Sequence, residues 1–490
     1  MAPMRPEVGA RVGAPRAARL SVFLLLLAST APSGAQSFTP PLVGGFAFSG
    51  PAAASVTSIY YNPAAIGLVD GTAFHLSFQG SYDAISIDRS PINPATGAAV
   101  AAGTPGARSF PGVREGAFAP GGFFGLTSDL GTEKVTVGVA VYTPYYERRF
   151  PGKPQPTPGQ DGPTRYHLLE TTQYHLYTTP TVTFRVIKQL YVGAGIDIVW
   201  SDLATLTFDR DTALEGQLCD LARDGVEADA CAERIRVRGS VWSVGVPVGV
   251  LIRPFRGLDF GVTYRSGLFG TTRANVPFIG SGSLTKPGNT SGEDVFARTT
   301  MHVPHMVLAG LQLDLPARLD LGISVRWLHW ATEEIVEVRL SSATATERDV
   351  PEHVPLYRGY QDSFTIKALL GYRPVPRLRL GLGGILQTAP VDTRAVSPAV
   401  VDGWQLWGLV LGEVQVLRWL SLSGGYGLRA MLPRTVDASL FDPFFQVDCA
   451  ASLYDIPTCR PANRGRGVAS GAGKYSSYGH HFGVATTMQF

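Results

Sequence analysis

Residues 241–265 read VWSVGVPVGVLIRPFRGLDFGVTYR, and this stretch decides the fold. From Trp242 to Val250 a large apolar side chain stands at every second position, with Ser, Gly or Pro between. After a short turn, residues 258–265 alternate in the same way. A period of two places successive side chains on opposite faces of a β-strand. The stretch therefore predicts two paired strands, each with one apolar face.

The face opposite the apolar one separates a soluble sandwich from a membrane barrel. In residues 319–327 the large apolar side chains alternate with Asp320, Gly322, Ser324 and Arg326. Across the strand-like segments this second face is rich in Gly and other small residues, with charges interspersed. Such a pattern suits a barrel whose outside meets lipid and whose inside is crowded or wet.

The same alternation recurs along the chain and predicts an all-β, 14-stranded antiparallel transmembrane β-barrel. The fourteen segments are 72–87, 119–129, 133–147, 171–187, 190–209, 236–253, 258–269, 294–314, 317–339, 359–373, 377–389, 403–417, 419–431 and 475–490. Short turns alternate with long connectors at 88–118, 148–170, 210–235, 270–293, 340–358, 390–402 and 432–474. Outer-membrane barrels have short periplasmic turns and long external loops. The barrel is therefore predicted for residues 72–490, with both ends on the periplasmic side.

The N-terminus and the composition agree with export. Residues 1–35 combine four arginines, a short apolar run and a small-residue cleavage site, which predicts a signal peptide. No later apolar run is long enough for a spanning helix, which takes roughly 20 residues. Only 17% of the 490 residues are charged, and no Lys/Arg cluster indicates nucleic acid as a partner. We expect a monomer in the outer membrane of a Gram-negative bacterium, in contact with outer-membrane lipid.

Two features of the connectors add expectations. The connector 210–235 has leucines at helical spacing, which predicts a helical external loop that serves as a lid or folds on itself. Export makes disulfides possible, and proximity in the sequence favours Cys219–Cys231 and Cys449–Cys459 over free thiols. No cysteine spacing typical of a metal site is present, and no cofactor is expected.

Residues 36–71 precede the first strand and do not alternate. They combine a stretch of small residues with the run YYNPAAIGL at residues 60–68. An Asn-Pro pair favours a turn. The segment has too many aromatic residues and too little charge for a disordered tail. We expect it to be ordered and to fit inside the barrel.

At this point the sequence resembles a known family, the FadL-type long-chain fatty acid transporters (OMPP1/FadL/TodX). Residues 52–68, with YYNPA at their centre, look like the family's N-terminal hatch. VGVPVGVLIRPFRGLDFGVTYRS (244–266), HVPHMVLAGL (302–311) and LLGYRP (369–374) look like its paired strands, in order. The resemblance covers nearly all of the mature chain. It implies a barrel closed by a hatch, here Phe46, Phe48, Tyr61, Asn62, Pro63 and Ala64.

The resemblance also implies a function. The family moves hydrophobic molecules, typically long-chain fatty acids, inward without ATP, and the ligand is thought to leave sideways through the barrel wall. Pro144 lies in the third predicted strand and cannot donate to a sheet ladder. We interpret it as the kink that opens the wall, although the strand could simply end there.

A carboxylate head group in an apolar lumen needs a cationic partner. The alternation places five cations on the inner face, and one or two of them are expected to bind the head group. They are Arg265, Arg326, Lys367, Arg379 and Arg429. The alternative is that these cations pair with Asp197, Asp259 or Asp320.

Two rival functions remain. A general diffusion porin would have a charged constriction and no plug. A barrel phospholipase would need a catalytic histidine on the lipid face, where His329 stands. The sequence lacks HExxH, GxSxG and a complete Walker A motif, so we expect no catalytic residues.

Overall fold

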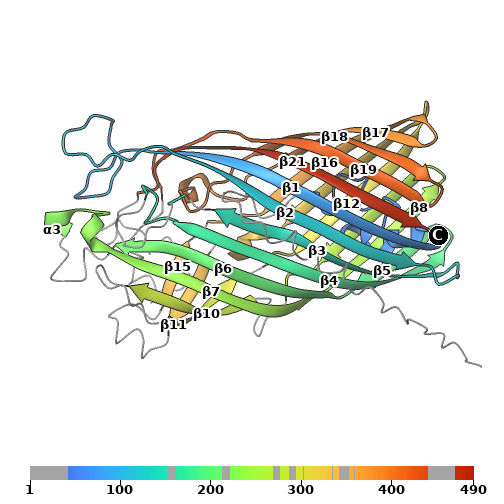
Figure 1. Ribbon diagram of the computed structural model, residues 1–490, viewed down its shortest axis with the longest axis horizontal. Coiled ribbons are helices and arrows are strands. Elements are labelled where there is room, and N and C mark those ends of the chain that lie inside the picture. Colours follow the sequence, from blue (N-terminus) through green and yellow to red (C-terminus); the bar gives the residue numbers. More distant parts are fainter. Residues whose placement is uncertain are drawn as a thin grey trace, which may run out of the picture. The chain divides into compact units, whose positions relative to one another are not determined.

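The computed structural model describes residues 42–149, 151–152, 162–211, 221–268, 276–285, 294–301, 303–333, 335–340, 353–357, 359–439 and 470–490. The predicted signal peptide lies outside these residues. The strands pair antiparallel in one sheet, and the first strand, β1 (Thr72–Arg89), pairs with the last, β21 (Gly473–Gln489). The sheet is therefore a closed barrel (Figure 1).

Fourteen strands form the wall, as predicted, and seven of them consist of two pieces. The undivided strands are β1, β2 (Val113–Ser128), β3 (Val135–Arg149), β4 (Glu170–Ile187), β17 (Leu378–Gln387), β18 (Gln405–Leu417) and β21. The divided strands are β5 (Leu190–Gly195) with β6 (Asp197–Asp211), β8 (Pro247–Phe255) with β7 (Ala232–Gly245), β9 (Leu258–Arg265) with β10 (Val276–Thr285), β12 (Met306–Leu315) with β11 (Asp294–Met301), β13 (Leu319–Leu328) with β14 (Ile335–Leu340), β16 (Ser363–Val375) with β15 (His353–Tyr357), and β19 (Leu420–Met431) with β20 (Arg434–Val436).

Four of the predicted long connectors contain strands. β2 begins within the predicted connector 88–118, β10 lies within 270–293, β15 lies within 340–358 and β20 lies within 432–474. These pieces extend the wall past the apolar stretches, where the alternation that marks lipid-facing strands is weak. Sequence periodicity finds the strand inside the membrane and misses its continuation beyond it.

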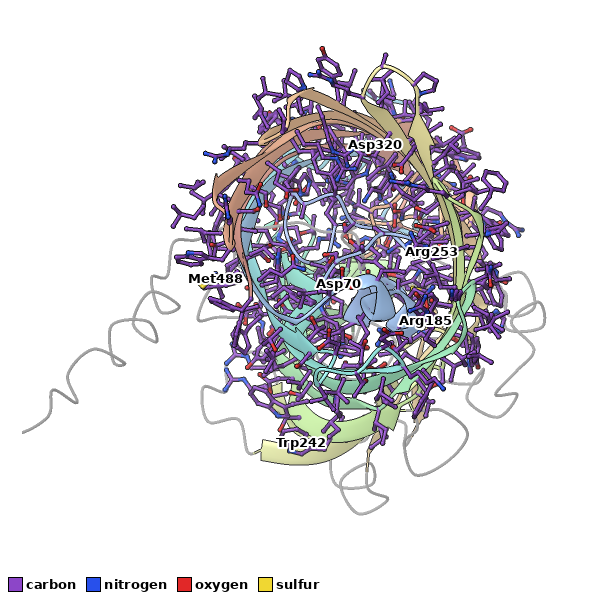
Figure 2. All side chains as sticks on the ribbon, turned by 90° about the vertical axis from the view of Figure 1, so that its right-hand side faces the viewer. Asp70, Arg185, Trp242, Arg253, Asp320 and Met488 are labelled. Atoms are coloured by element: carbon purple, nitrogen blue, oxygen red, sulfur yellow. The ribbon has the colours of Figure 1, made fainter. Side chains whose placement is uncertain are left out.

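The predicted two faces of the wall are confirmed. In the stretch that decided the fold, Trp242, Val244, Val248 and Val250 are exposed on the outside. Figure 2 looks along the barrel from the end where the C-terminus lies, and shows Trp242 outside the ring. An exposed apolar band of this extent is stable only in contact with lipid.

The two ends of the barrel differ. The short turns and the chain end lie together, and there Thr72 N donates to Phe490 O (3.1 Å) and Phe490 N donates to Thr72 O (2.8 Å). In the part of the chain that the structure describes, no helix has the length and apolarity to cross a bilayer. We call the end with the long connectors the outer end.

Candidate functional site

The segment from Leu42 to Gly71 lies inside the barrel (Figure 2), and we call it the N-terminal segment. It contains the helical turns α2 (Ser58–Tyr61) and η1 (Pro63–Leu68), whose residues are mostly buried. The η1 turn packs against β4, β5 and β8. The expectation that this segment fits inside the barrel agrees with these contacts.

Asn62 anchors the centre of the N-terminal segment. Its Nδ2 donates to Pro51 O (2.7 Å) and to Val250 O of the wall (3.1 Å), and its Oδ1 accepts from Ala64 N (3.0 Å). The wall beneath it carries Gly249, where a Cβ would overlap Asn62 Oδ1. Glycine is thus required because the side chains of Asn62 and Pro63 touch the backbone of the wall.

The two phenylalanines of the segment also pack on glycine. Phe46 lies against Gly425 and Gly483, and Phe48 lies against Gly381. The small residues that alternate with apolar ones in the sequence therefore form the inner surface on which the N-terminal segment packs. All six residues predicted for the hatch are buried in the lumen, at Phe46, Phe48, Tyr61, Asn62, Pro63 and Ala64.

Arg265 joins the N-terminal segment to three wall strands. Its guanidinium binds the Asp197 carboxylate and donates to Tyr142 Oη (3.0 Å) and to Tyr60 O at the end of α2 (3.0 Å). Thr179 Oγ1 donates to the other carboxylate oxygen of Asp197 (2.7 Å). Arg265 is therefore neutralised by Asp197, one of the three carboxylates named from the sequence as alternative partners of the luminal cations.

Two more of the five predicted cations have carboxylate partners. Arg379 binds Asp320 and stacks on Phe48, with the guanidinium carbon 3.5 Å from the ring centroid. Arg429 Nη2 lies 2.7 Å from Asp83 Oδ1. Both pairs face the lumen, as the alternation predicted, but their charge is balanced within the protein.

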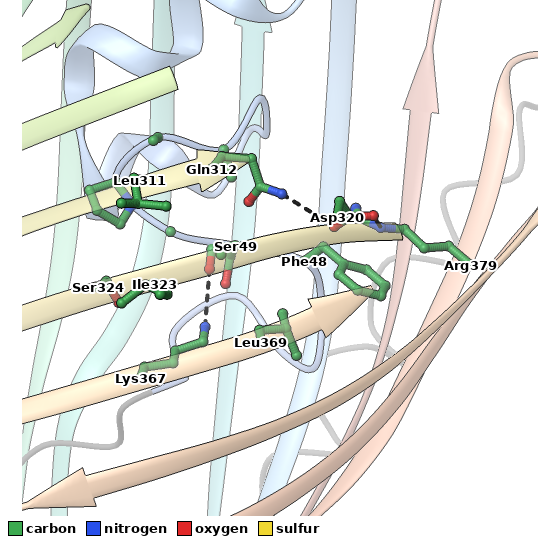
Figure 3. Close-up of a pocket in the computed structure, with 15 residues that line it drawn as sticks. Phe48, Ser49, Leu311, Gln312, Asp320, Ile323, Ser324, Lys367, Leu369 and Arg379 are labelled. Carbon is green, nitrogen blue, oxygen red and sulfur yellow. Dashed lines mark hydrogen bonds and ion pairs between the residues drawn. The ribbon is translucent and has the colours of Figure 1, made fainter. Parts of the chain in front are cut away.

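Arg326 and Lys367 differ from the other three. Lys367 Nζ donates to Ser49 O of the N-terminal segment (3.0 Å; Figure 3), and Arg326 Nη2 donates to Thr365 Oγ1 (3.2 Å). Both side chains are buried, and neither has a carboxylate partner among the residues that the structure describes. Arg326 Nε and Ser49 Oγ are buried without a hydrogen-bond partner there.

These two cations are neighbours on the inner face. Arg326 opposes Thr365 and Ser324 opposes Lys367 in the ladder between β13 and β16, so the two cations form a diagonal pair. Diagonal neighbours on two paired strands lie roughly 7–8 Å apart across the sheet, within reach of long side chains. Two adjacent buried positive charges are unfavourable unless an anion lies between them.

Pro144 lies in a bulge of β3. Thr143 and Pro144 together oppose one residue of β4, because Tyr142 pairs with Tyr177 and Tyr145 with His175. A bulge of this kind shifts the facing of the strand by one residue. Tyr142 is buried before the bulge and Arg149 is buried after it.

The wall is interrupted beside this bulge. Although β2 begins at Val113, its described ladder with β3 covers Phe123–Ser128 and stops at the pair Phe123–Tyr142. Residues 113–122 pair with β1 alone, and residues 145–149 pair with β4 alone. A small pocket lies here, lined by residues of both edges and by Phe46.

A buried connector covers the lumen from the outer end. Residues 389–402, which we call the outer connector, place Val391, Val396 and Val400 in the same apolar cluster as Ile59 and Tyr61 of the N-terminal segment. The connector includes a 3-10 turn, η4 (Thr393–Ala395). The lumen is therefore filled with apolar side chains between the N-terminal segment and the outer connector.

The described part of the connector predicted as helical packs on other parts of the chain at the outer end. It contains α3 (Leu221–Asp224) and η2 (Asp229–Cys231), and α3 is a single turn. Glu227 pairs with Arg89 of β1 at 2.8 Å, and its main-chain oxygen accepts from Arg165 Nη2 (2.7 Å). Two connectors and the outer end of β1 thus meet at Glu227, and we call this assembly the outer cap.

The cysteine pairing remains a prediction. Cys231 is disulfide-bonded and buried in the outer cap. The other three cysteines, Cys219, Cys449 and Cys459, lie outside the described residues.

His329 faces outward, as the alternation predicted. Its Nδ1 lies 2.8 Å from Asp362 Oδ1, and its ring stacks on Trp327 at a centroid distance of 5.4 Å. In the described structure no serine hydroxyl bonds to the imidazole. No group of three or more metal-binding side chains occurs among the described residues.

Sequence reasoning missed three inner residues. Trp330 and Trp407 are buried in the lumen, and Trp407 packs on His481 with centroids 4.3 Å apart. Gln405 and Leu409, two residues before and after Trp407, share its inward facing, and this period of two could have identified it. Arg149 was also missed, because the bulge that turns it inward breaks the alternation.

Comparison with known proteins identifies the family of this chain. Residues 24–408 match the model of the outer membrane protein transport protein family (OMPP1/FadL/TodX). The chain belongs to this family. Membership makes it a transport protein of the Gram-negative outer membrane that acts on hydrophobic compounds. The family is one of transporters, not of enzymes. No curated protein sequence matches the chain significantly.

Solved structures of this family share the fold. A Pseudomonas aeruginosa FadL homologue is 15% identical, with a TM-score of 0.71 over 93% of this chain and 100% of that one. The Ralstonia pickettii toluene transporter TbuX is 14% identical, with a TM-score of 0.57 over 91% and 99%. The Pseudomonas putida toluene transporter TodX is 12% identical, with a TM-score of 0.58 over 90% and 96%.

Proposed function

We propose that the protein takes up long-chain fatty acids, or closely similar amphipathic anions, passively across the outer membrane. It acts as a monomer whose lumen is closed by the N-terminal segment as a hatch, and the ligand leaves sideways through the wall. The observation that carries the proposal is the pair of uncompensated luminal cations, Arg326 and Lys367.

The cations favour an anionic ligand over a neutral hydrocarbon. Arg265, Arg379 and Arg429 each have a carboxylate partner, and binding a second carboxylate would leave the first one unpaired. Arg326 and Lys367 have no such competitor among the described residues. A carboxylate between them would accept charge-assisted hydrogen bonds, which are worth about 1.5–3 kcal/mol each.

The surroundings of the pair suit an amphipathic molecule. Tyr61 lies beside Lys367, with the ammonium nitrogen 5.7 Å from the ring centroid, and belongs to the apolar cluster that fills the lumen. An acyl chain would displace these apolar contacts and replace them with its own. Because Lys367 donates to Ser49 O, a carboxylate that draws the ammonium away releases a contact that holds the hatch.

The interrupted wall supports a lateral exit. The edges of β2 and β3 diverge beyond Phe123, and the pocket at this place is lined on the inner side by Phe46 of the hatch. A hydrophobic molecule released by movement of the hatch would meet this gap before any aqueous space. The path from lumen to lipid then avoids water, which is favourable for an acyl chain.

Ligand binding with matched neutral and charged probes tests the anion site. In the purified full chain, Arg326→Met and Lys367→Met should each weaken palmitate binding at least tenfold, about 1.4 kcal/mol. Binding of hexadecanol should change by less than twofold. Arg429→Lys, which keeps a cation beside Asp83, is the control and should bind both probes normally. Equal losses for palmitate and hexadecanol would contradict the anion site.

A second experiment tests the exit separately. Ala119→Trp would fill the pocket between β2 and β3, and should slow uptake of labelled palmitate by cells while leaving binding to the purified protein unchanged. Gly408→Trp is the control, because a Cβ at Gly408 meets no atom within 4 Å. Normal uptake with Ala119→Trp would argue against the lateral exit.

The rival functions have direct tests. A general porin should conduct ions steadily in a planar bilayer, whereas a barrel closed by a hatch should conduct little. A phospholipase should lose lipid cleavage in His329→Ala. For the family transporter we expect low conductance and no cleavage that depends on His329.

A further inference from the structure

We propose that Arg149 is a positioning residue of transport: it ties the free edge of β3 to the outer connector and so holds the gap in the wall in its resting form. The proposal rests on the proposed lateral exit. It adds that the outer barrier of the lumen and the side exit move together.

Arg149 binds the outer connector through two main-chain carbonyls. Its Nη1 donates to Ala399 O (2.7 Å) and its Nη2 donates to Pro398 O (2.6 Å). The side chain is buried, and no carboxylate among the described residues pairs with it. Burying a guanidinium without a carboxylate partner is costly, and here only the two carbonyl hydrogen bonds offset that cost. The cost is lowest when the carbonyls of the outer connector stay in place.

The position of Arg149 in β3 gives this contact its effect. Residues 145–149 pair with β4 but have no described ladder with β2, so this piece of β3 is an edge strand inside an otherwise closed wall. Edge strands lack one set of backbone hydrogen bonds and are held by fewer contacts. Arg149, at the end of the piece, links it to an element other than β4.

The bulge at Pro144 is what turns this anchor inward. Before the bulge the buried residues of β3 have even numbers, as at Ala140 and Tyr142. After it they have odd numbers, as at Glu147 and Arg149. Without the extra residue, Arg149 would face the lipid and could not reach the outer connector.

The outer connector is held from a second side by a residue that has no part in the gap. Arg434 of β20 donates through Nη1 to Val391 O (2.9 Å) and Asp402 O (3.1 Å), near the two ends of the connector. Arg149 and Arg434 therefore clamp the same connector in the same way, through carbonyls. Only Arg149 comes from a strand that borders the gap, which makes Arg434 a matched control.

Hydrogen exchange of the full chain in lipid nanodiscs tests the tether without any ligand. Arg149→Met should raise deuterium uptake at least threefold both in residues 145–149 and in the outer connector. Arg434→Met should raise it in the outer connector alone. Unchanged exchange in residues 145–149 of Arg149→Met would overturn the proposal, and so would an equal rise there in Arg434→Met.

A conservative variant and a kinetic measurement complete the test. Arg149→Lys keeps the charge but cannot span two carbonyls, so it should show an intermediate rise, and it serves if Arg149→Met does not fold. Release of a bound fluorescent C16 fatty acid from the protein to lipid vesicles should be several times faster in Arg149→Met than in Arg434→Met. If the wild type binds no fatty acid, the proposed function fails, while the exchange experiment still decides the tether.

Discussion

Asn62 Oδ1 occupies the space that a Cβ on Gly249 would need, so that the N-terminal segment touches the bare backbone of the wall at this point. The same asparagine donates to Val250 O, one residue further along β8. Contact and hydrogen bond together fix the segment against one strand. The fit depends on the absence of a single carbon atom.

Gly249→Ala should loosen the N-terminal segment. The added carbon overlaps Asn62 Oδ1, and overpacking of this kind costs typically about 1–3 kcal/mol. We expect higher single-channel conductance and faster entry of small hydrophilic solutes than in the wild type. Gly408→Ala is the control, since a Cβ there meets nothing within 4 Å. Equal conductance of the two variants would show that this contact does not hold the segment.

Arg265→Met should destabilise the barrel without changing the ligand site. It leaves the Asp197 carboxylate buried without its guanidinium, and breaking a buried pair costs about 3–5 kcal/mol. Denaturant unfolding in detergent measures the loss, and Asp197→Asn in the same chain should recover part of it. Palmitate affinity should stay within twofold of the wild type. A large loss of affinity would instead identify Arg265 as a head-group ligand.

Glu227→Gln should open the outer cap. Arg89 and Glu227 form a bidentate pair whose side chains are 2% and 1% exposed, so its loss should cost the cap about 3–5 kcal/mol. Protease cleavage within residues 90–112 and 221–232 should rise accordingly. Asp88→Asn is the control, because the Arg114–Asp88 pair is exposed and such pairs are worth about 0–1 kcal/mol. Equal cleavage of both variants would contradict the role of Glu227.

Acid should loosen the junction between the N-terminal segment and β1. Asp129, in the turn after β2, accepts from Gly131 N (2.9 Å) and Gly71 N (2.7 Å), and these hydrogen bonds lower the pKa of Asp129 below its ordinary 3.8. A lowered pKa in the folded protein stabilises the fold above pH 3.8, and this stabilisation is lost as the pH falls through the lowered value. Amide exchange at Gly71 should therefore accelerate in strong acid. In Asp129→Asn it should be faster at neutral pH and depend less on acidity, and an unchanged profile would contradict this.

The sequence predicted which face of a strand a residue occupies better than it predicted the residue's ion-pair partner. Alternation placed Arg326 and Lys367 on the inner surface, because a strand has a period of two regardless of what surrounds it. It could not pair Arg429 with Asp83, which lies 346 residues away and meets it only when the barrel closes. Proline at 144 marked a break in β3, yet the turning of Arg149 depends on how many residues the bulge contains, which composition does not encode.

The hydrogen bonds between the first and last strands of the barrel set an order for assembly. Thr72 and Phe490 close the seam between β1 and β21, and Gly71 fits there because a Cβ would overlap Phe490 O. A chain emerging N-terminus first cannot complete this seam until Phe490 is available. We predict that the N-terminal segment is enclosed while the seam is still open, so a chain without residues 473–490 should leave Asn62→Cys accessible to a thiol reagent that the full chain excludes. The N-terminal segment then enters the barrel through the open seam between β1 and β21 during biogenesis, before any ligand can bind.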